Sequence, residues 1–95
     1  MASESIVKTS KSCFYCGSEV GLHRHHCIHG TSGRALAEKH GLWVYLCPYH
    51  HEFVHSKDGV AHDLVLKQMA ETAWLKKHPD RDLEDWIAIF GKNYL

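Results

Sequence analysis

The sequence predicts a small α+β domain with two short strands and four helices. Its 95 residues are enough for one domain and too few for two. Residues 42–47 (LWVYLC) have the aromatic and β-branched character of a strand, and apolar residues recur at helical spacing in the second half of the chain. Because so short a chain buries little apolar surface, we expect a metal ion to help hold the fold together.

The N-terminal part of the chain contains one predicted turn and one predicted strand. Residues 1–11 are polar and predict a flexible, loosely ordered lead-in to a single domain over residues 12–95. Residues 13–17 (CFYCG) have the pattern of a metal-binding knuckle, a tight turn that presents two thiols to one ion. Residues 20–28 are predicted to form the first short strand.

Two helices are predicted on either side of the second strand. Ser32 is a candidate N-cap for a helix over residues 34–40, and Gly41 is expected to end that helix. The second strand then leads into a helix over residues 48–56, because the proline at its start suits the first position of a helix.

Two further helices are predicted near the C-terminus. Asp63 is a candidate cap for a helix with apolar residues at helical spacing, and His78, which precedes a proline, marks its end. A helix over residues 83–90 starts with acidic side chains, which the helix dipole favours there, and Gly91 is expected to close it. We interpret both as helices that pack against the core.

The four cysteines indicate metal binding rather than disulfide bonds. The N-terminal residues contain no apolar segment typical of a secretory signal, and no stretch is long enough to span a bilayer. We therefore expect a cytoplasmic protein. In a reducing compartment, a Cys-x-x-Cys pair among many histidines is typical of a metal site.

The charge distribution places a small basic excess in the first half of the chain. The formal net charge is zero with histidine neutral, which argues against a large surface that coats nucleic acid nonspecifically. Residues 1–47 carry five Lys or Arg against three Glu, and residues 48–95 carry six against eight Asp or Glu. The basic half contains most of the candidate ligands.

Two short, paired spacings predict a structural zinc site. Cys13 and Cys16 form one pair, and Cys47 and His50 form a second pair about thirty residues later. Two such pairs that face each other supply the four ligands of a tetrahedral zinc ion. An alternative set has Cys27 in place of His50, and we favour His50 because it completes a pair at the start of a helix.

Histidine is the unusual part of the composition. There are ten histidines, and nine of them lie within residues 23–62. His51 and His55 are four residues apart, so on a helix they share one face and can hold one metal with a third ligand from a neighbouring strand. The adjacent His25 and His26 point in opposite directions at a strand end. One of them can therefore bind the metal while the other stays free as a base.

The motifs follow one another in a characteristic order: CxxC, then HH, then a strand that ends in LCxxHH, then HxxxH on a helix. This order resembles that of zinc-containing HNH endonucleases, especially the short HNH-type proteins of phages and prophages. The stretches GLHRHH, HGLWVYLCPYHH and FGKNYL have the same character, and the resemblance covers roughly residues 13–95. The spacing from HH to HxxxH is also similar to that of colicin-type DNases.

The resemblance implies a fold and a role for each histidine. The core of the domain, over about residues 20–57, would be the ββα-metal unit, also called a His-Me finger. His25, His51 and His55 match the ligands of one catalytic divalent metal, which would be Mg²⁺, Mn²⁺, Ni²⁺ or Zn²⁺. His26 matches the general base.

The resemblance also implies a metal-dependent endonuclease that hydrolyses the phosphodiester bonds of DNA in a bacterial or phage-infected host cell. His26 would take a proton from the attacking water, and the metal would stabilise the leaving 3′ oxygen. Arg24 and Arg34 are candidate contacts to the phosphate backbone of DNA. The alternative function is a noncatalytic zinc module of the same fold that binds DNA or a protein.

One position departs from the family pattern. The central Asn of the HNH name helps to orient the base histidine in the family, but no Asn occurs here between His26 and His51. We expect a backbone carbonyl or a side chain such as that of His40 to hold His26 instead.

Overall fold

Two antiparallel strands and four α-helices make up the part of the chain that the computed structural model describes, which is residues 4–8 and 10–95. This arrangement confirms the α+β class predicted from the sequence. In chain order the elements are β1 (His23–His26), α1 (Thr31–His40), β2 (Trp43–Leu46), α2 (Pro48–Val54), a 3₁₀ turn (Lys57–Gly59), α3 (Val60–Lys77) and α4 (Leu83–Phe90).

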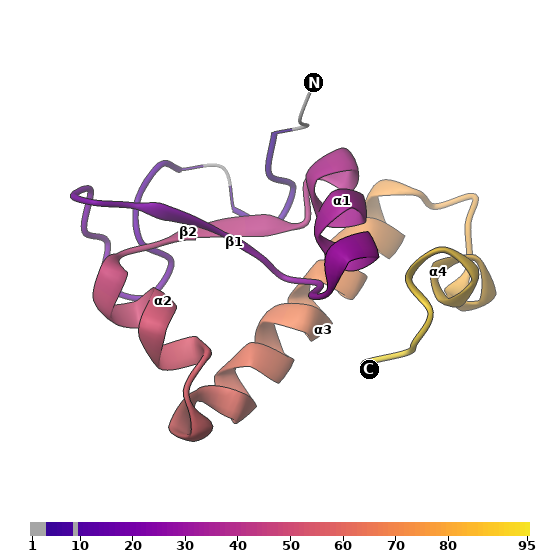
Figure 1. Cartoon of the computed structure of the whole chain (residues 1–95). Helices are drawn as coiled ribbons and strands as arrows, with labels where there is room; N and C mark the ends of the chain where they lie inside the picture. Colours follow the sequence, from indigo (N-terminus) through magenta and orange to yellow (C-terminus); the bar gives the residue numbers. More distant parts are fainter. Residues whose placement is uncertain (1–3, 9) are drawn as a thin grey trace.

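The two strands pair antiparallel to form a small sheet. Helix α1 connects β1 to β2, and α2 follows β2 after one residue. His23 pairs with Leu46 at one end of the sheet, and His26 pairs with Trp43 at the other end. Only Cys47 separates β2 from α2, which contacts both strands. In Figure 1, α2 and α3 lie below the sheet, and the antiparallel register places the start of β1 next to the end of β2, from which α2 begins.

The core lies between the sheet and the helices. In β2, Val44 and Leu46 are buried, and Trp74 of α3 is 1% exposed. Trp86 and Phe90 of α4 stack with ring centroids 3.9 Å apart. The structure thus confirms that α3 and α4 pack against the core. No helix in the described residues has the length and apolar composition needed to cross a membrane.

Both strands and the start of α1 differ from the predicted bounds. Both strands are shorter than expected, since regular pairing covers only His23–His26 and Trp43–Leu46 of the predicted ranges. Helix α1 begins at Thr31 with Gly30 as its N-cap, so Ser32 does not cap it. Gly30 has a φ of 83°, which glycine adopts at little cost, and this allows the helix to begin earlier.

The boundary between α2 and α3 also differs from the prediction. Helix α2 ends at Val54 rather than at residue 56, because the 3₁₀ turn begins at Lys57. Helix α3 begins at Val60, so Asp63 lies inside its first turn and is not its cap. The carboxylate of Asp63 instead forms a hydrogen bond with His29. The predicted ends of α1 at Gly41 and of α4 at Gly91 are correct, and both glycines have a left-handed backbone conformation.

The described part of the N-terminal segment packs against β2, although we predicted a loosely ordered lead-in. Ser5 is buried, and its Oγ donates a hydrogen bond to the Trp43 carbonyl. The backbone N–H of Ile6 donates to the Gly41 carbonyl at 2.9 Å. The side chain of Ser5 thus forms its hydrogen bonds with the protein rather than with solvent. Residues 1–3 and 9 of the predicted lead-in lie outside the described residues.

Gly41 provides a test of how firmly this segment is docked. A Cβ at Gly41, whose φ is 72°, would lie 2.2 Å from the Glu4 carbonyl oxygen, whereas a Cβ at Gly91, whose φ is 89°, would meet nothing within 4 Å. Gly91→Ala should lower the free energy of unfolding by about 1 kcal/mol, the cost of a left-handed alanine. Gly41→Ala should cost roughly 1–3 kcal/mol more, because of the overlap. Urea unfolding of the metal-loaded variants measures both, and equal losses would show that residues 4–8 are not docked.

Candidate metal centres

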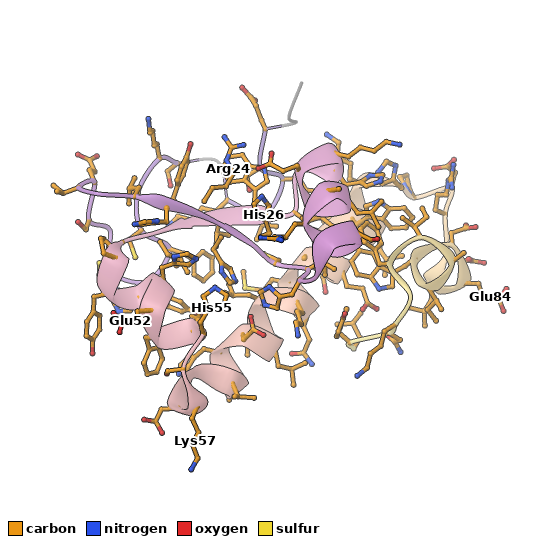
Figure 2. All side chains as sticks on the ribbon, viewed as in Figure 1. Arg24, His26, Glu52, His55, Lys57 and Glu84 are labelled. Atoms are coloured by element: carbon orange, nitrogen blue, oxygen red, sulfur yellow. The ribbon has the colours of Figure 1, made fainter. Side chains whose placement is uncertain are left out.

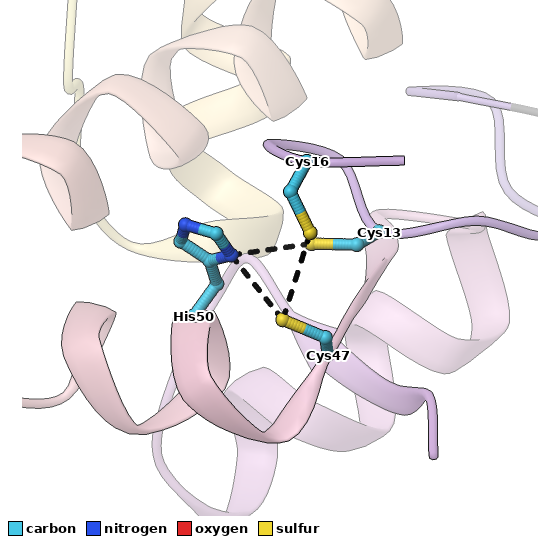
Figure 3. A group of neighbouring side chains, drawn as sticks. All are labelled: Cys13, Cys16, Cys47 and His50. Atoms are coloured by element: carbon cyan, nitrogen blue, oxygen red, sulfur yellow. Dashed lines mark hydrogen bonds between the residues drawn. The ribbon is translucent and has the colours of Figure 1, made fainter. Parts of the chain in front are cut away.

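Three cysteines and one histidine converge where the N-terminal turn meets the start of α2. Each of Cys13, Cys16, Cys47 and His50 offers one ligand atom, and these four atoms all lie within 4.8 Å of one another. Figure 3 shows the thiols and the imidazole pointing toward a common centre. The sequence-predicted set is therefore brought together in space, and it is compatible with a structural metal ion.

The distances between these atoms fit a tetrahedral ion. The Sγ atoms of Cys16 and Cys47 are 3.8 Å apart, and Cys13 Sγ lies 3.6 Å from His50 Nδ1. Around zinc, with bonds of about 2.3 Å to sulfur and 2.05 Å to nitrogen, a tetrahedron has S···S edges of roughly 3.8 Å and S···N edges of roughly 3.6 Å. The Cys47 Sγ to His50 Nδ1 distance is shorter, at 3.2 Å. All four cysteines of the chain are free thiols.

The local fold fixes the two ligand pairs relative to each other. The Cys13 carbonyl accepts a hydrogen bond from the Gly17 N–H, which closes the turn around the first pair. The Phe14 N–H donates to the Tyr45 carbonyl at 2.9 Å, which attaches this turn to β2. Cys47 and His50 follow directly at the start of α2. The second pair is thus held by the same strand that anchors the first.

The Cys13 thiol is prepared to ionise. Burial raises its pKa, but hydrogen bonds from nearby backbone groups, first of all those of Cys47 and Cys16, outweigh burial and lower the pKa to about 6. Because the thiolate is the form that binds metals, this environment favours metal binding.

Cys27, the alternative fourth ligand, does not join this cluster. It is fully buried and belongs to none of the metal-ligand groups formed by the described residues. Burial, together with the negative charge of Asp63, raises the pKa of the Cys27 thiol to about 12. Cys27 is therefore a neutral core side chain, and the structure brings His50 to the cluster in its place.

A second cluster consists of imidazole rings from β1 and from the end of α2. His25, His51 and His55 offer ligand atoms within 4.8 Å of one another. Their ring centroids are separated by 5.6 Å (His25–His51), 5.2 Å (His25–His55) and 4.9 Å (His51–His55). The neighbours His50 and His51 thus face different clusters, and His55 takes part from the C-cap position of α2.

His25 is the buried member of this cluster. Its side chain is 1% exposed, and its Nε2 has no hydrogen-bond partner in the described structure. Burial, followed by the nearby His29 and His55, lowers its pKa to about 3. The ring is therefore neutral, and a buried ring nitrogen without a partner costs free energy unless something binds it. This orphaned nitrogen fits a metal ligand.

Sequence reasoning missed two residues that border the same cluster. His29 Nε2 lies 2.7 Å from Asp63 Oδ1, and His25 Nε2 lies 3.7 Å from the same oxygen. His25, His29 and Asp63 form a further group of possible ligands. Burial raises the pKa of Asp63, but the hydrogen bond to His29 and the charges of His29 and Lys67 lower it overall, so the carboxylate is ionised. No spacing signal links His29 to Asp63, because only the packing of α3 brings them together.

His26 and Arg24 lie on the other face of β1. His26 Nε2 is 2.7 Å from Glu38 Oε1, and Arg24 Nη1 is 2.9 Å from Glu38 Oε2. The Arg24 guanidinium also lies over the Trp43 ring at 3.9 Å. Burial raises the pKa of Glu38, but the hydrogen bonds from His26 and Arg24 lower it overall. Figure 2 shows Arg24 and His26 on the opposite side of the strand from His55.

Glu38, not His40, is the side chain that holds His26. His40 lies instead against the aromatic core, with its ring centroid 5.4 Å from that of Phe90. Helical geometry explains the difference, since residues 38 and 40 of α1 point about 200° apart around the helix. Of these two residues, Glu38 is therefore the one that faces β1.

The remaining histidines near the clusters have distinct surroundings. His23 lies on the same face of β1 as His25, and its ring stacks on that of His51 with centroids 5.1 Å apart. His62 packs against Tyr15 and Phe53 and belongs to none of the ligand groups in the described part of the chain. Arg34 is exposed in the first turn of α1.

Comparisons of the chain with protein-family models, curated proteins and solved structures found no match.

The first cluster predicts which cysteines hold the metal. Cys47→Ser should lose the bound metal, which we expect to be zinc, and should unfold, because binding free energy at such a site contributes to folding. Cys27→Ser, the matched control, should keep one zinc per chain and remain folded. Metal analysis and circular dichroism of the purified variants test this. Loss of zinc from Cys27→Ser with retention in His50→Ala would overturn the ligand assignment.

Proposed function

We propose that this protein is a metal-dependent endonuclease of the HNH type that hydrolyses phosphodiester bonds of DNA in a bacterial or phage-infected cell. The observation that carries the proposal is the convergence of His25, His51 and His55 from a strand end and a following helix. This cluster lies next to a four-ligand cluster that fits a structural zinc ion.

The order of elements supports the same proposal. An antiparallel pair of strands followed directly by a helix is the ββα arrangement that the sequence resemblance implies, with His25 on the first strand and His51 on the helix. The two clusters differ in ligand number. A set of four protein ligands is typical of structural zinc, and a set of three leaves positions open for substrate, as catalytic sites require.

The protein residues of the second cluster would hold the ion next to the phosphate of the substrate. A divalent ion held there would act as a Lewis acid that stabilises negative charge on the leaving 3′ oxygen. His25, buried and neutral, fixes the inner side of the cluster, while His51 and His55 face it from α2. His55 is exposed, so a phosphate of DNA can approach from that side.

His26 and Glu38 provide one candidate for the general base. If the Nε2–H of His26 donates a hydrogen bond to the Glu38 carboxylate, then Nδ1 carries the lone pair that can accept a proton from water. Glu38 would thereby fix the tautomer and orientation of the ring, the role that the missing Asn has in the family. The bond from Arg24 holds Glu38 in turn.

His23 provides a second candidate, because it lies on the cluster side of β1. Its ring is exposed and stacks on His51, so a water molecule near the cluster is within easier reach of His23 than of His26. Arg34 remains a candidate contact to DNA phosphate. Arg24 fits that role only if its hydrogen bonds with Glu38 are rearranged by DNA.

The ligand assignment predicts a contrast between two histidines close together in the chain. His55→Ala should abolish plasmid cleavage at limiting divalent metal, because it removes one of three ligands. His62→Ala should leave most of the cleavage, because His62 contacts Tyr15 and Phe53 instead. Plasmid nicking with Mg²⁺, Mn²⁺, Ni²⁺ or Zn²⁺ measures both variants. The opposite pattern would show that the loop, not the helix end, delivers the ligand.

The two base candidates make different predictions. If His26 is the base, His26→Ala should reduce cleavage by roughly two to four orders of magnitude and leave metal affinity unchanged. Glu38→Gln, which keeps an acceptor for the ring N–H but loses the charge, should have a smaller effect in the same direction. A loss confined to His23→Ala would assign the base to His23.

The alternative function is a noncatalytic module of the same fold that binds DNA or a protein. The observation that favours it is that Arg24 and His26 are both engaged by Glu38, on the face opposite the histidine cluster. If the wild-type protein cuts no plasmid with any of the four metals but retains DNA in a gel-shift assay, this alternative replaces the nuclease.

A further inference from the structure

We propose that His25 is shared by two overlapping cation positions, one with His51 and His55 and the other with His29 and Asp63. The first position has only imidazole ligands, and the second includes a carboxylate. The inference extends the proposed metal site of the nuclease. Its test measures metal binding, so its outcome does not depend on whether the protein cuts DNA.

The geometry of the second position is as compact as that of the first. His25, His29 and Asp63 each offer a ligand atom, and these atoms lie within 4.8 Å of one another. The three residues come from β1, from the loop after it, and from the first turn of α3. The ring of His29 lies 5.3 Å from that of His25 and 5.5 Å from that of His55, which places the two positions side by side.

His25 is the residue that makes the two positions overlap. Its Nε2 is buried without a partner and is 3.7 Å from Asp63 Oδ1. A neutral imidazole has one lone pair and therefore binds one ion at a time. An ion bound by His25 can take its remaining ligands from α2 or from His29 and Asp63, so the structure provides alternatives for one ion rather than a pair of ions.

The two ligand sets favour different metals. Imidazole nitrogens suit Zn²⁺, Ni²⁺ and Co²⁺, whereas carboxylate oxygen suits Mn²⁺ and Mg²⁺. Lys67 Nζ lies 3.3 Å from Asp63 Oδ2, which leaves Oδ1 as the oxygen that faces His29 and His25. The positive charge of Lys67 should keep this position weaker than the all-imidazole position. We therefore expect Mn²⁺ to depend on Asp63, and Ni²⁺ to depend on His51 and His55.

Binding of Mn²⁺ and Ni²⁺ to the zinc-loaded protein tests the proposal. Free Mn²⁺ is measured by its electron paramagnetic resonance signal, and Ni²⁺ binding is measured by calorimetry. Asp63→Asn should weaken Mn²⁺ binding by roughly 10-fold or more and change Ni²⁺ binding by less than about 3-fold. His51→Ala should do the reverse. Asp80→Asn, at an exposed carboxylate, is the matched control and should change neither affinity.

Three outcomes would overturn the proposal: no effect of Asp63→Asn on Mn²⁺, equal weakening of both metals, or the same pattern in Asp80→Asn. Zinc content and circular dichroism show whether each variant is folded. If Asp63→Asn does not fold, His29→Ala is the second variant, and it should weaken Mn²⁺ selectively in the same way. Selective metal binding without plasmid cleavage would support the two positions and reject only the nuclease.

Discussion

The junction between β2 and α2 is the constraint on which the rest of the structure depends. Cys47 is the only residue between the two elements, so the strand end, the thiol and the helix start are fixed together. The turn around Cys13 is attached to the same strand through the Phe14 N–H and the Tyr45 carbonyl. One tetrahedral ion at this place would thus tie the N-terminal turn, the sheet and α2 into one unit. It would also set the direction of α2, and with it the position of His51.

The alternation of side chains along β1 separates two polar systems. His23 and His25 face α2, and Arg24 and His26 face α1, because successive residues of a strand point to opposite sides. The first side gathers imidazole rings around the buried His25, and the second gathers a carboxylate with its guanidinium and imidazole partners. A strand of four residues therefore carries both a metal-binding face and a face that is held by hydrogen bonds.

The sequence predicts the contacts that depend on local spacing and misses those that depend on packing. The pairs Cys13–Cys16 and Cys47–His50 can be predicted from the sequence, because a knuckle and a helix start have short, fixed spacings. The two pairs then meet because both are attached to β2. The roles of Glu38 and Asp63 cannot be predicted from the sequence. Each residue reaches its histidine partner from a helix whose rotation is set by core residues such as Trp74. The start of α1 differs from the prediction for a related reason. Gly30 is the N-cap and lets the helix begin at Thr31, earlier than a cap by the Ser32 side chain would.

Glu38 couples a candidate DNA contact, Arg24, to a candidate general base, His26. Its carboxylate is shared by Arg24 and His26, so any group that draws Arg24 away also changes the surroundings of the His26 ring. A DNA phosphate is such a group, because guanidinium binds phosphate and carboxylate with the same bidentate geometry. Glu38 would then be left with His26 alone, and the ring would keep one fixed orientation while its other nitrogen faces solvent. On this argument, the hydrogen bonds of Arg24 in the free protein are compatible with a nuclease whose base is fully arranged only when DNA is bound.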